Sequence, residues 1–145
     1  MTIEKLSPDN IKHLLPLVLE LWPDCVSEEE YEYYSGMISA EQDICYLAGI
    51  DDVYIAFIHL SVRNDYVEGA DDLPVAYIEG IYVKPAYQRN GVAKQLVQLA
   101  ENWAREKGIK QIASDTSVNN DQAIAFHKGL GFNEAERIVC FIRTL

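Results

Sequence analysis

The chain has 145 residues, enough to bury a core of its own, and we expect residues 1–145 to form a single domain. Apolar residues make up 49% and charged residues 24%, and no run approaches the ~20 consecutive apolar residues of a membrane span. The formal net charge of −11 argues against a nucleic-acid partner, which would need a basic surface. It favours a cationic partner, although an acidic surface also serves solubility.

Cysteine and histidine usage predicts neither a disulfide framework nor a metal site. Cys25, Cys45 and Cys140 are odd in number and far apart, and the three histidines are scattered. The N-terminus also lacks the basic-then-apolar layout of a signal peptide. We therefore expect reduced thiols, no bound metal and a cytoplasmic location.

Hydrophobic periodicity and turn residues predict ten elements along the chain. They are a strand at 2–6, a helix at 9–21, a helix from 27 to about 40, strands at 43–49, 53–62 and 74–84, a helix at 91–107, a strand at 110–116, a helix at 121–129 and a closing strand at 136–144. Asp51 and Asp52 form a turn between two strands, Ser27 and Glu30 read as a capping box, and residues 63–73 form an acidic loop.

The order of these elements predicts an α/β fold with a mixed sheet. A strand at 74–84, a helix at 91–107 and a strand at 110–116 imply a crossover that joins two parallel neighbours. We therefore expect an α/β sheet with a mixed edge.

The segment from Gln88 to Lys94 lies where a strand ends and a helix begins. Helix N-termini present unpaired N–H groups and the positive end of a dipole, and the small residues Gly91 and Ala93 allow an anion to approach them. Arg89 and Lys94 add local positive charge. The spacing matches neither a Walker loop nor a dinucleotide-binding fingerprint, and a glycine that only caps the helix is the alternative reading.

The segment Gln88-Arg-Asn-Gly-Val-Ala93 resembles the Q/R-x-x-G-x-G/A motif of the GNAT superfamily of N-acetyltransferases, and the stretch from Asn120 to Phe132 resembles its second motif. The resemblance spans nearly the whole chain and implies the GNAT fold, a splayed central sheet and acetyl-CoA as co-substrate. It implies that the coenzyme contacts Ile81, Tyr82, Val83, Gln88, Arg89, Asn90, Gly91, Val92, Ala93, Lys94 and Asn120. For Asn120, capping of the following helix is the simpler alternative.

Two carboxylates mark the predicted acceptor side. Glu79 interrupts an apolar strand, where glutamate is uncommon and costly to bury without a partner. Asp115 ends the neighbouring parallel strand, so both side chains are expected beside the thioester. An internal ion pair between Glu79 and an arginine, and a loop-capping role for Asp115, are the structural alternatives.

Several segments, including Leu21-Trp-Pro-Asp24 and Pro74-Val-Ala-Tyr-Ile-Glu-Gly-Ile81, are similar to the aminoglycoside 6′-N-acetyltransferases within this superfamily. The resemblance implies an acceptor pocket formed by Trp22, Tyr66, Glu79, Asp115 and Glu136. Clustered carboxylates and aromatic rings suit a polycationic aminoglycoside through ion pairs and cation–π contacts.

The chemistry expected is direct attack of the 6′-amine on acetyl-CoA in a ternary complex, with Glu79 or Asp115 as the catalytic group that helps remove the amine proton. Where many superfamily members carry a tyrosine that protonates the leaving thiolate, this chain has His127. The imidazole either donates that proton or only fills packing space.

Two other functions remain open on sequence grounds: acetylation of a different cationic amine, such as a polyamine or a peptide, and a non-catalytic acyl-CoA-binding module. The apolar strand expected near Ile138–Ile142 would leave an exposed edge, which indicates a homodimer formed by strand addition.

Overall fold

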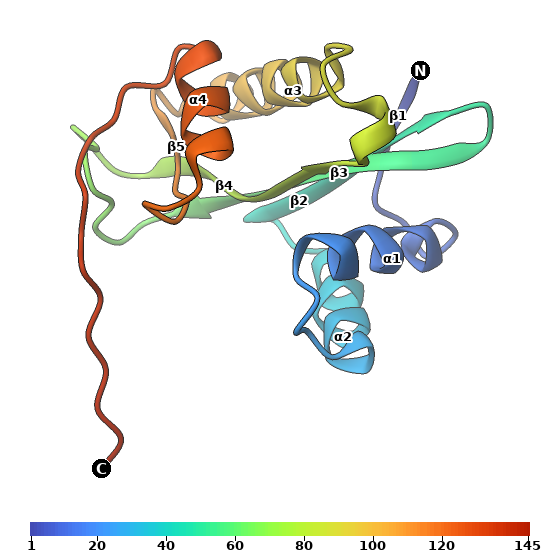
Figure 1. The fold of residues 1–145 in the computed structure, drawn as a ribbon, viewed down its shortest axis with the longest axis horizontal. Coiled ribbons are helices and arrows are strands. Elements are labelled where there is room, and N and C mark those ends of the chain that lie inside the picture. The colour runs from blue at the N-terminus through green and yellow to red at the C-terminus, as the bar shows by residue number, and fades with distance from the viewer.

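The chain folds into five strands and four α-helices, and the computed structural model describes all 145 residues. In chain order (Figure 1) the elements are β1 (Thr2–Lys5), α1 (Ile11–Leu21), α2 (Ser27–Met37), β2 (Asp43–Ile50), β3 (Val53–Arg63), β4 (Val75–Val83), the 3-10 turn η1 (Pro85–Tyr87), α3 (Val92–Glu106), β5 (Ile112–Ser114) and α4 (Asp121–Gly129).

The sheet has the order β1-β2-β3-β4-β5, in which the first four strands pair antiparallel and β4 pairs parallel with β5. The predicted α/β class with a mixed sheet is confirmed. The turn at Asp51 and Asp52 is also confirmed: both residues have positive φ, 51° and 63°, as a tight hairpin turn requires.

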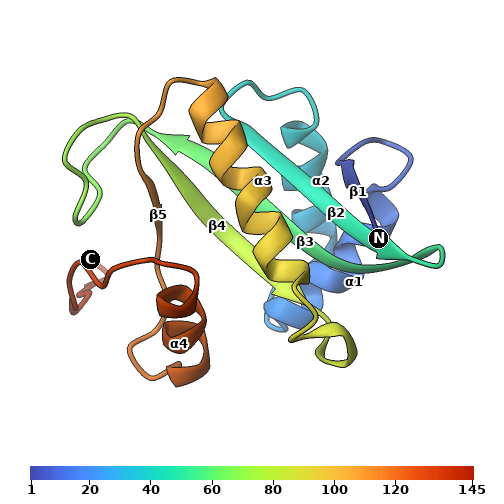
Figure 2. The ribbon, with the colours of Figure 1, turned by 90° about the horizontal axis from the view of Figure 1, so that it is seen from above.

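Helices cover both faces of the sheet (Figures 1 and 2). α3 packs on one face through Leu96, Val97 and Ala100, which join the larger apolar core. α1 and α2 lie on the opposite face, where Leu14, Val18 and other apolar side chains form a second core. The sheet therefore separates an α3 face from an α1/α2 face.

β4 has two irregularities beside the candidate site: it diverges from β5 to leave a fork between the two strands, and it contains a bulge. Pairing with β5 covers only Ala76–Ile78, so residues 79–83 have no strand partner on that side, and the two strands diverge in Figure 2. On the other side, His59 pairs with Gly80 and Leu60 with Ile78, which leaves Glu79 as the extra residue of a β-bulge. Bulges redirect side chains and often occur beside active sites.

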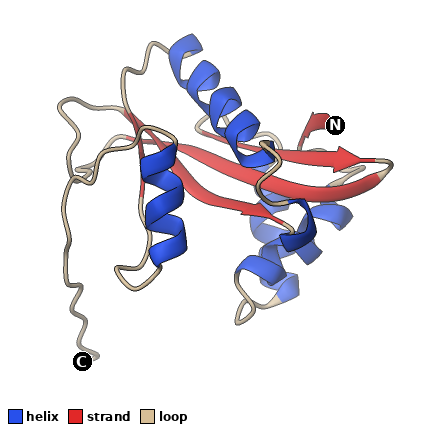
Figure 3. Ribbon diagram, turned by 45° about the horizontal axis from the view of Figure 1, so that its top comes forward, coloured by secondary structure: helices blue, strands red, loops and turns tan.

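Two sequence predictions are wrong. The closing strand expected at 136–144 does not form: residues after Phe132 have no regular structure and extend away from the body (Figures 1 and 3). An apolar run makes a strand only where a neighbour supplies hydrogen bonds, and residues 136–144 pair with no strand of this chain. The capping box is also absent, because Val26 is the N-cap of α2 and Ser27 is already its first helical residue.

No helix is long and apolar enough to serve as a membrane span.

Candidate active site

The segment between β4 and α3 forms a tight loop that leads into the N-terminus of α3. Gln88 Nε2 donates to the carbonyl of Val83 at 2.9 Å and ties the loop to the end of β4. Arg89 and Gly91 have positive φ values of 62° and 80°, and Gly91 is the N-cap of α3. A β-carbon at Gly91 would meet no atom within 4 Å, so glycine serves the backbone conformation here and leaves room for an anion.

Some of the predicted coenzyme-binding residues offer exposed side chains to a ligand, and others are buried and offer only their backbone. Arg89, Asn90 and Lys94 are exposed, and their side chains are available to a ligand. Val92 is buried, with only 4% of its surface exposed, and belongs to the α3-face core. It can therefore contact a coenzyme only through its backbone N–H. The last residue of β4, Val83, is likewise buried in that core.

The unpaired edge of β4 lies between this loop and Glu79. Ile81 and Tyr82 belong to this edge, where peptide groups of residues 79–83 have no partner in β5. The Tyr82 hydroxyl donates to Glu20 at 2.6 Å. Burial and this hydrogen bond raise the pKa of Tyr82 to about 12, so the phenol stays neutral.

α4 brings Asn120 and His127 toward the end of β5. Asn120 is the N-cap of α4, and its Oδ1 accepts from Ala123 N at 3.0 Å, so the capping role is present. His127 Nδ1 lies 2.6 Å from the carbonyl of Ala123 and therefore donates to it. In the neutral tautomer, Nε2 then accepts from the Ser114 hydroxyl at 2.8 Å.

Glu79 is held by two neighbours on β3. Its Oε1 accepts from Ser61 Oγ at 2.6 Å and from Arg63 Nε at 2.9 Å, and its Oε2 accepts from Arg63 Nη2 at 2.8 Å. Burial acts to raise the pKa of Glu79, but the hydrogen bonds from Arg63 and Ser61 and the charge of Arg63 outweigh it and lower the pKa. Glu79 is therefore ionised at neutral pH, and the ion pair considered from the sequence exists.

Tyr77 links the Arg63–Glu79 pair to the second carboxylate. The guanidinium carbon of Arg63 lies 3.4 Å from the centre of the Tyr77 ring, and the Tyr77 hydroxyl donates to Asp115 Oδ2. Burial, followed by the hydrogen bond to Asp115, raises the pKa of Tyr77, so the phenol remains a donor. Glu79 and Asp115 thus belong to one connected cluster, and the exposed Asp115 directly follows β5.

Trp22, the C-cap of α1, approaches β4 from the α1/α2 face of the sheet. A β-carbon at Gly80 would come within 2.5 Å of the indole Cη2, so the ring lies against the residue that follows Glu79. The ring also makes an edge contact with Phe57, at 6.3 Å between centroids. Trp22 therefore lies beside β4 at Gly80, the residue that follows Glu79.

Tyr66 lies in the acidic loop and Glu136 in the C-terminal segment, close enough for the charge of Glu136 to act on the Tyr66 hydroxyl. The Tyr66 side chain is 77% exposed, and its hydroxyl donates to Glu68 at 3.0 Å. That hydrogen bond, then the charges of Glu68 and Glu136, raise the pKa of Tyr66. A β-carbon at Gly69 would come within 2.5 Å of the β-carbon of Ala135, so the C-terminal segment passes close to the acidic loop.

Sequence reasoning missed Ser61, Arg63 and Tyr77. The predicted strand ended at residue 62, but β3 continues to Arg63. His59, Ser61 and Arg63 alternate along β3, a period-2 polar pattern that could have extended the strand by one residue and placed Arg63 opposite β4.

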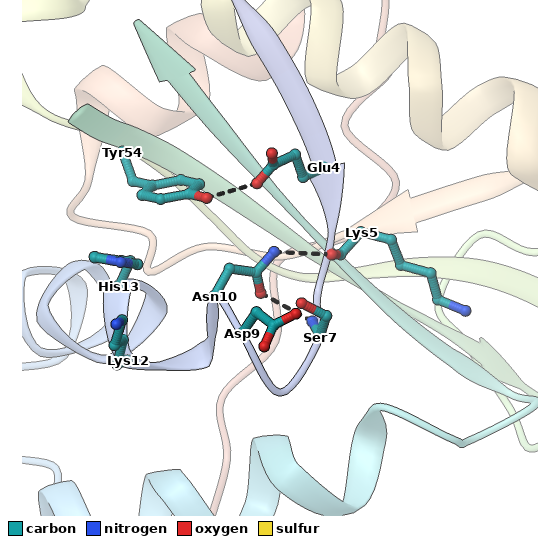
Figure 4. Close-up of a pocket in the computed structure, with 8 residues that line it drawn as sticks. All are labelled: Glu4, Lys5, Ser7, Asp9, Asn10, Lys12, His13 and Tyr54. Atoms are coloured by element: carbon teal, nitrogen blue, oxygen red, sulfur yellow. Dashed lines mark hydrogen bonds between the residues drawn. The ribbon is translucent and has the colours of Figure 1, made fainter. Parts of the chain in front are cut away.

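Elsewhere, a polar hollow of about 350 Å³ opens between β1, the start of α1 and β3 (Figure 4). The Tyr54 hydroxyl donates to Glu4 at 2.6 Å, and His13 stacks on the Tyr54 ring. None of the predicted site residues lines this hollow. No group of His, Cys, Asp or Glu side chains is arranged to hold a metal ion.

The site combines three features: a loop at a helix N-terminus, an unpaired strand edge and an adjacent acidic cluster. The loop suits a phosphorylated carrier and the cluster suits a cation, so the site suits group transfer from one to the other. Residues 11–132 match the acetyltransferase (GNAT) family, and the chain belongs to that family.

The relatives agree in length and name. The chain is 35% identical to aminoglycoside N(6′)-acetyltransferase type 1 of Salmonella enteritidis over 97% of both chains. It is 39% identical to the protein of the same name from Acinetobacter genomosp. 13, also over 97% of both. AAC(6′)-Iy in complex with the bisubstrate analogue CoA-S-monomethyl-acetylneamine superposes with a TM-score of 0.95 at 33% identity, with 99% of this chain and 98% of that chain covered. AAC(6′)-Ig from Acinetobacter haemolyticus gives 0.95 at 34%, with 100% and 99% covered.

Proposed function

We propose that this protein is an acetyl-CoA-dependent aminoglycoside 6′-N-acetyltransferase and that residues 1–145 form one acetyltransferase domain. The observation that carries the proposal is the cluster of Glu79 and Asp115, joined through Arg63 and Tyr77, beside the fork between β4 and β5. Full-length relatives with this name and the complex of AAC(6′)-Iy with a CoA–aminoglycoside analogue support it. Such an enzyme confers aminoglycoside resistance.

On the donor side, the backbone N–H groups at the start of α3 would hold the coenzyme diphosphate, with Gln88, Arg89, Asn90 and Lys94 around it. The open space at Gly91 fits this role. The unpaired edge at Ile81, Tyr82 and Val83 would hold the pantetheine arm, with Asn120 at the side of α4. A backbone N–H of this edge would stabilise the carbonyl oxygen as charge develops on it.

On the acceptor side, Glu79 and Asp115 would hold the 6′-ammonium group, with the Trp22 ring as a wall of the pocket. Tyr66 and Glu136 would contact another ring of the aminoglycoside. A polycation suits this acidic surface and the chain's net charge of −11.

In the reaction, the neutral amine attacks the thioester carbon, the C–S bond breaks, and the second proton that the nitrogen must lose passes to the departing coenzyme A thiolate or to water. The ammonium form must first lose a proton. Ser61 and Arg63 occupy both oxygens of Glu79, whereas Tyr77 occupies only Oδ2 of Asp115, so we assign the proton to Asp115 through its Oδ1. In the neutral imidazole of His127, the Nδ1–H group bonds the Ala123 carbonyl and Nε2 accepts from Ser114, so the ring carries no proton for the thiolate and we assign it a packing role.

We also propose that the protein is a cytoplasmic homodimer. Ile138, Val139, Phe141 and Ile142 are between 61% and 100% exposed, and β5 is an edge strand of only three residues. Pairing of the extended segment with a second copy would cover both features. The three free cysteines suit a reducing compartment.

The test is the consumption of acetyl-CoA by the purified protein with kanamycin, tobramycin or spermidine, with the acetylated position determined by NMR. We expect turnover of the aminoglycosides and acetylation at the 6′-amine. Turnover of spermidine alone would replace the proposed substrate class, and binding of acetyl-CoA without turnover of any amine would indicate a non-catalytic module.

A further inference from the structure

Arg63 is the only lysine or arginine side chain that pairs with either carboxylate of the acceptor site. Its guanidinium binds both oxygens of Glu79 and stacks on the ring of Tyr77, whose hydroxyl bonds Asp115. Arg63 is thus fixed by two kinds of contact, one on each side, and it connects Glu79 to Asp115 through Tyr77.

The charges of this cluster do not match those of a simple ammonium site. Two carboxylates alone would present two negative charges, but with Arg63 the cluster carries one. A second negative charge would strengthen the binding of an ammonium group and also stabilise its protonated form, which cannot attack a thioester. Arg63 therefore lowers the pKa of the bound amine and eases its deprotonation. It should reduce the affinity for the substrate less, because the other ammonium groups of a polycation can bind other carboxylates.

No other group around the cluster supplies this positive charge permanently. The titratable side chains that face Glu79 or its neighbours, taken from each strand and helix, are Tyr33 on α2, Asp43 on β2, His59 on β3, Tyr77 on β4 and Asp115 after β5. Of these, His59 is buried and bonded to Asp43 at 3.0 Å. The tyrosines and acids can only be neutral or negative.

We propose that Arg63 is a positioning residue that allows the bound acceptor ammonium to lose its proton, by cancelling one of the two carboxylate charges and fixing Glu79 and Tyr77 beside the amine. The proposal rests on the proposed acetyltransferase function.

The experiment compares kcat as a function of pH, from 6 to 9.5, for the wild type and four variants with saturating tobramycin and acetyl-CoA. Arg63→Gln and Arg63→Met both remove the charge, so the result does not depend on one replacement folding. Arg63→Lys keeps the charge but loses the bidentate geometry. Arg105→Gln removes an arginine paired only with residues of α3 and controls for net charge.

In Arg63→Gln and Arg63→Met we expect the acid limb of the kcat–pH profile to move up by about one pH unit. One unit charge at roughly 6 Å from the amine in a partly solvated site gives a pKa shift of this size. At pH 7, kcat then falls about tenfold, the rates converge with the wild type at high pH, and KM for tobramycin stays constant or decreases. Arg63→Lys keeps the wild-type limb with a lower plateau, and Arg105→Gln keeps the whole profile.

A role in structure alone would give a different result. Neutral variants with an unshifted limb, or a raised KM and a kcat lowered equally at every pH, would overturn the proposal, as would an equal shift in Arg63→Lys. Thermal unfolding and the Kd of coenzyme A verify that the variants fold. If the wild type acetylates spermidine but no aminoglycoside, the substrate assignment fails separately, and the same profiles with spermidine still decide the role of Arg63.

Discussion

The indole ring of Trp22 occupies the space that a side chain at Gly80 would need: an added β-carbon would lie 2.5 Å from Cη2 and 3.1 Å from Cζ2. The end of α1 can approach β4 beside Glu79 only because residue 80 is glycine. This contact joins the helical layer to the predicted acceptor pocket.

The first prediction follows from that contact. Gly80→Ala should displace the Trp22 ring and raise KM for aminoglycosides about tenfold, with lower thermal stability because the clash lies in a packed region. Gly36→Ala is the matched control, since a β-carbon there meets nothing within 4 Å and a helical alanine stabilises by about 1 kcal/mol. An unchanged KM for aminoglycosides in Gly80→Ala would refute the assignment of Trp22 to the acceptor pocket.

The second prediction concerns the two carboxylates. Glu79→Gln and Asp115→Asn should each lower kcat/KM for aminoglycosides, by about 10- to 100-fold, because each loses a charge that holds or deprotonates the amine. Calorimetric titration with coenzyme A should give nearly unchanged Kd values. Glu106→Gln, which removes an acidic charge at the end of α3, should leave both quantities as in the wild type. Wild-type turnover in both pocket variants would refute the acceptor assignment.

The sequence predicted the elements that depend on local patterns. The hairpin at Asp51 and Asp52 and the helix that begins at Asp121 have local turn or cap chemistry, and both were located well. The C-terminal strand was wrong because strand formation depends on a neighbour, which no local pattern reveals. Arg63 was missed for a related reason: its partner is 16 residues away along the chain and opposite a bulge that alternation cannot foresee.

The third prediction separates the backbone conformation of the loop from its binding role. Gly91 and Gly108 have similar positive φ, 80° and 73°, and a β-carbon at either meets no atom within 4 Å. Alanine at either position should destabilise the fold by a similar amount, about 1 kcal/mol. Only Gly91→Ala should weaken acetyl-CoA binding, by about tenfold or more, because only this turn presents N–H groups to the diphosphate. Equal Kd values for the two variants, measured by calorimetry, would argue against a diphosphate site here.

The fourth prediction uses the lowered pKa of Glu79. A carboxyl group whose pKa is lower in the folded state stabilises the fold above its unfolded pKa, and this contribution is lost as pH falls through the folded value. The free energy of unfolding of the wild type should exceed that of Glu79→Gln by about 1 kcal/mol or less at pH 7, since the Arg63 side chain is 40% exposed.

That difference should narrow as the pH falls below about 4. Urea unfolding at pH 7, 5, 4 and 3.5 measures it, and all other carboxyl groups are common to both proteins. A difference that stays constant over this range would mean that the ion pair with Arg63 adds nothing to stability.

The fifth prediction concerns the extended C-terminal segment. Phe141→Lys combined with Ile142→Lys should convert a homodimer into monomers, because charged side chains oppose strand pairing between copies. Light scattering at several concentrations gives the mass directly. Val118→Lys, which alters an apolar residue that is 54% exposed in a loop, is the control and should keep the mass of the wild type. A wild-type protein that is monomeric throughout would refute the dimer.

The bulge in β4 has a consequence for how this chain can change over evolution. Because Glu79 is the surplus residue opposite His59 and Leu60, its direction depends on the number of residues in β4 as much as on their identity. Removing one residue before Glu79 would abolish the bulge, place Glu79 opposite Leu60 where Ile78 now pairs, and turn its carboxylate toward the α3 layer. Such a deletion would disable the acceptor side while the diphosphate loop stayed intact, so drift in this region should proceed by replacement and seldom by changes in length.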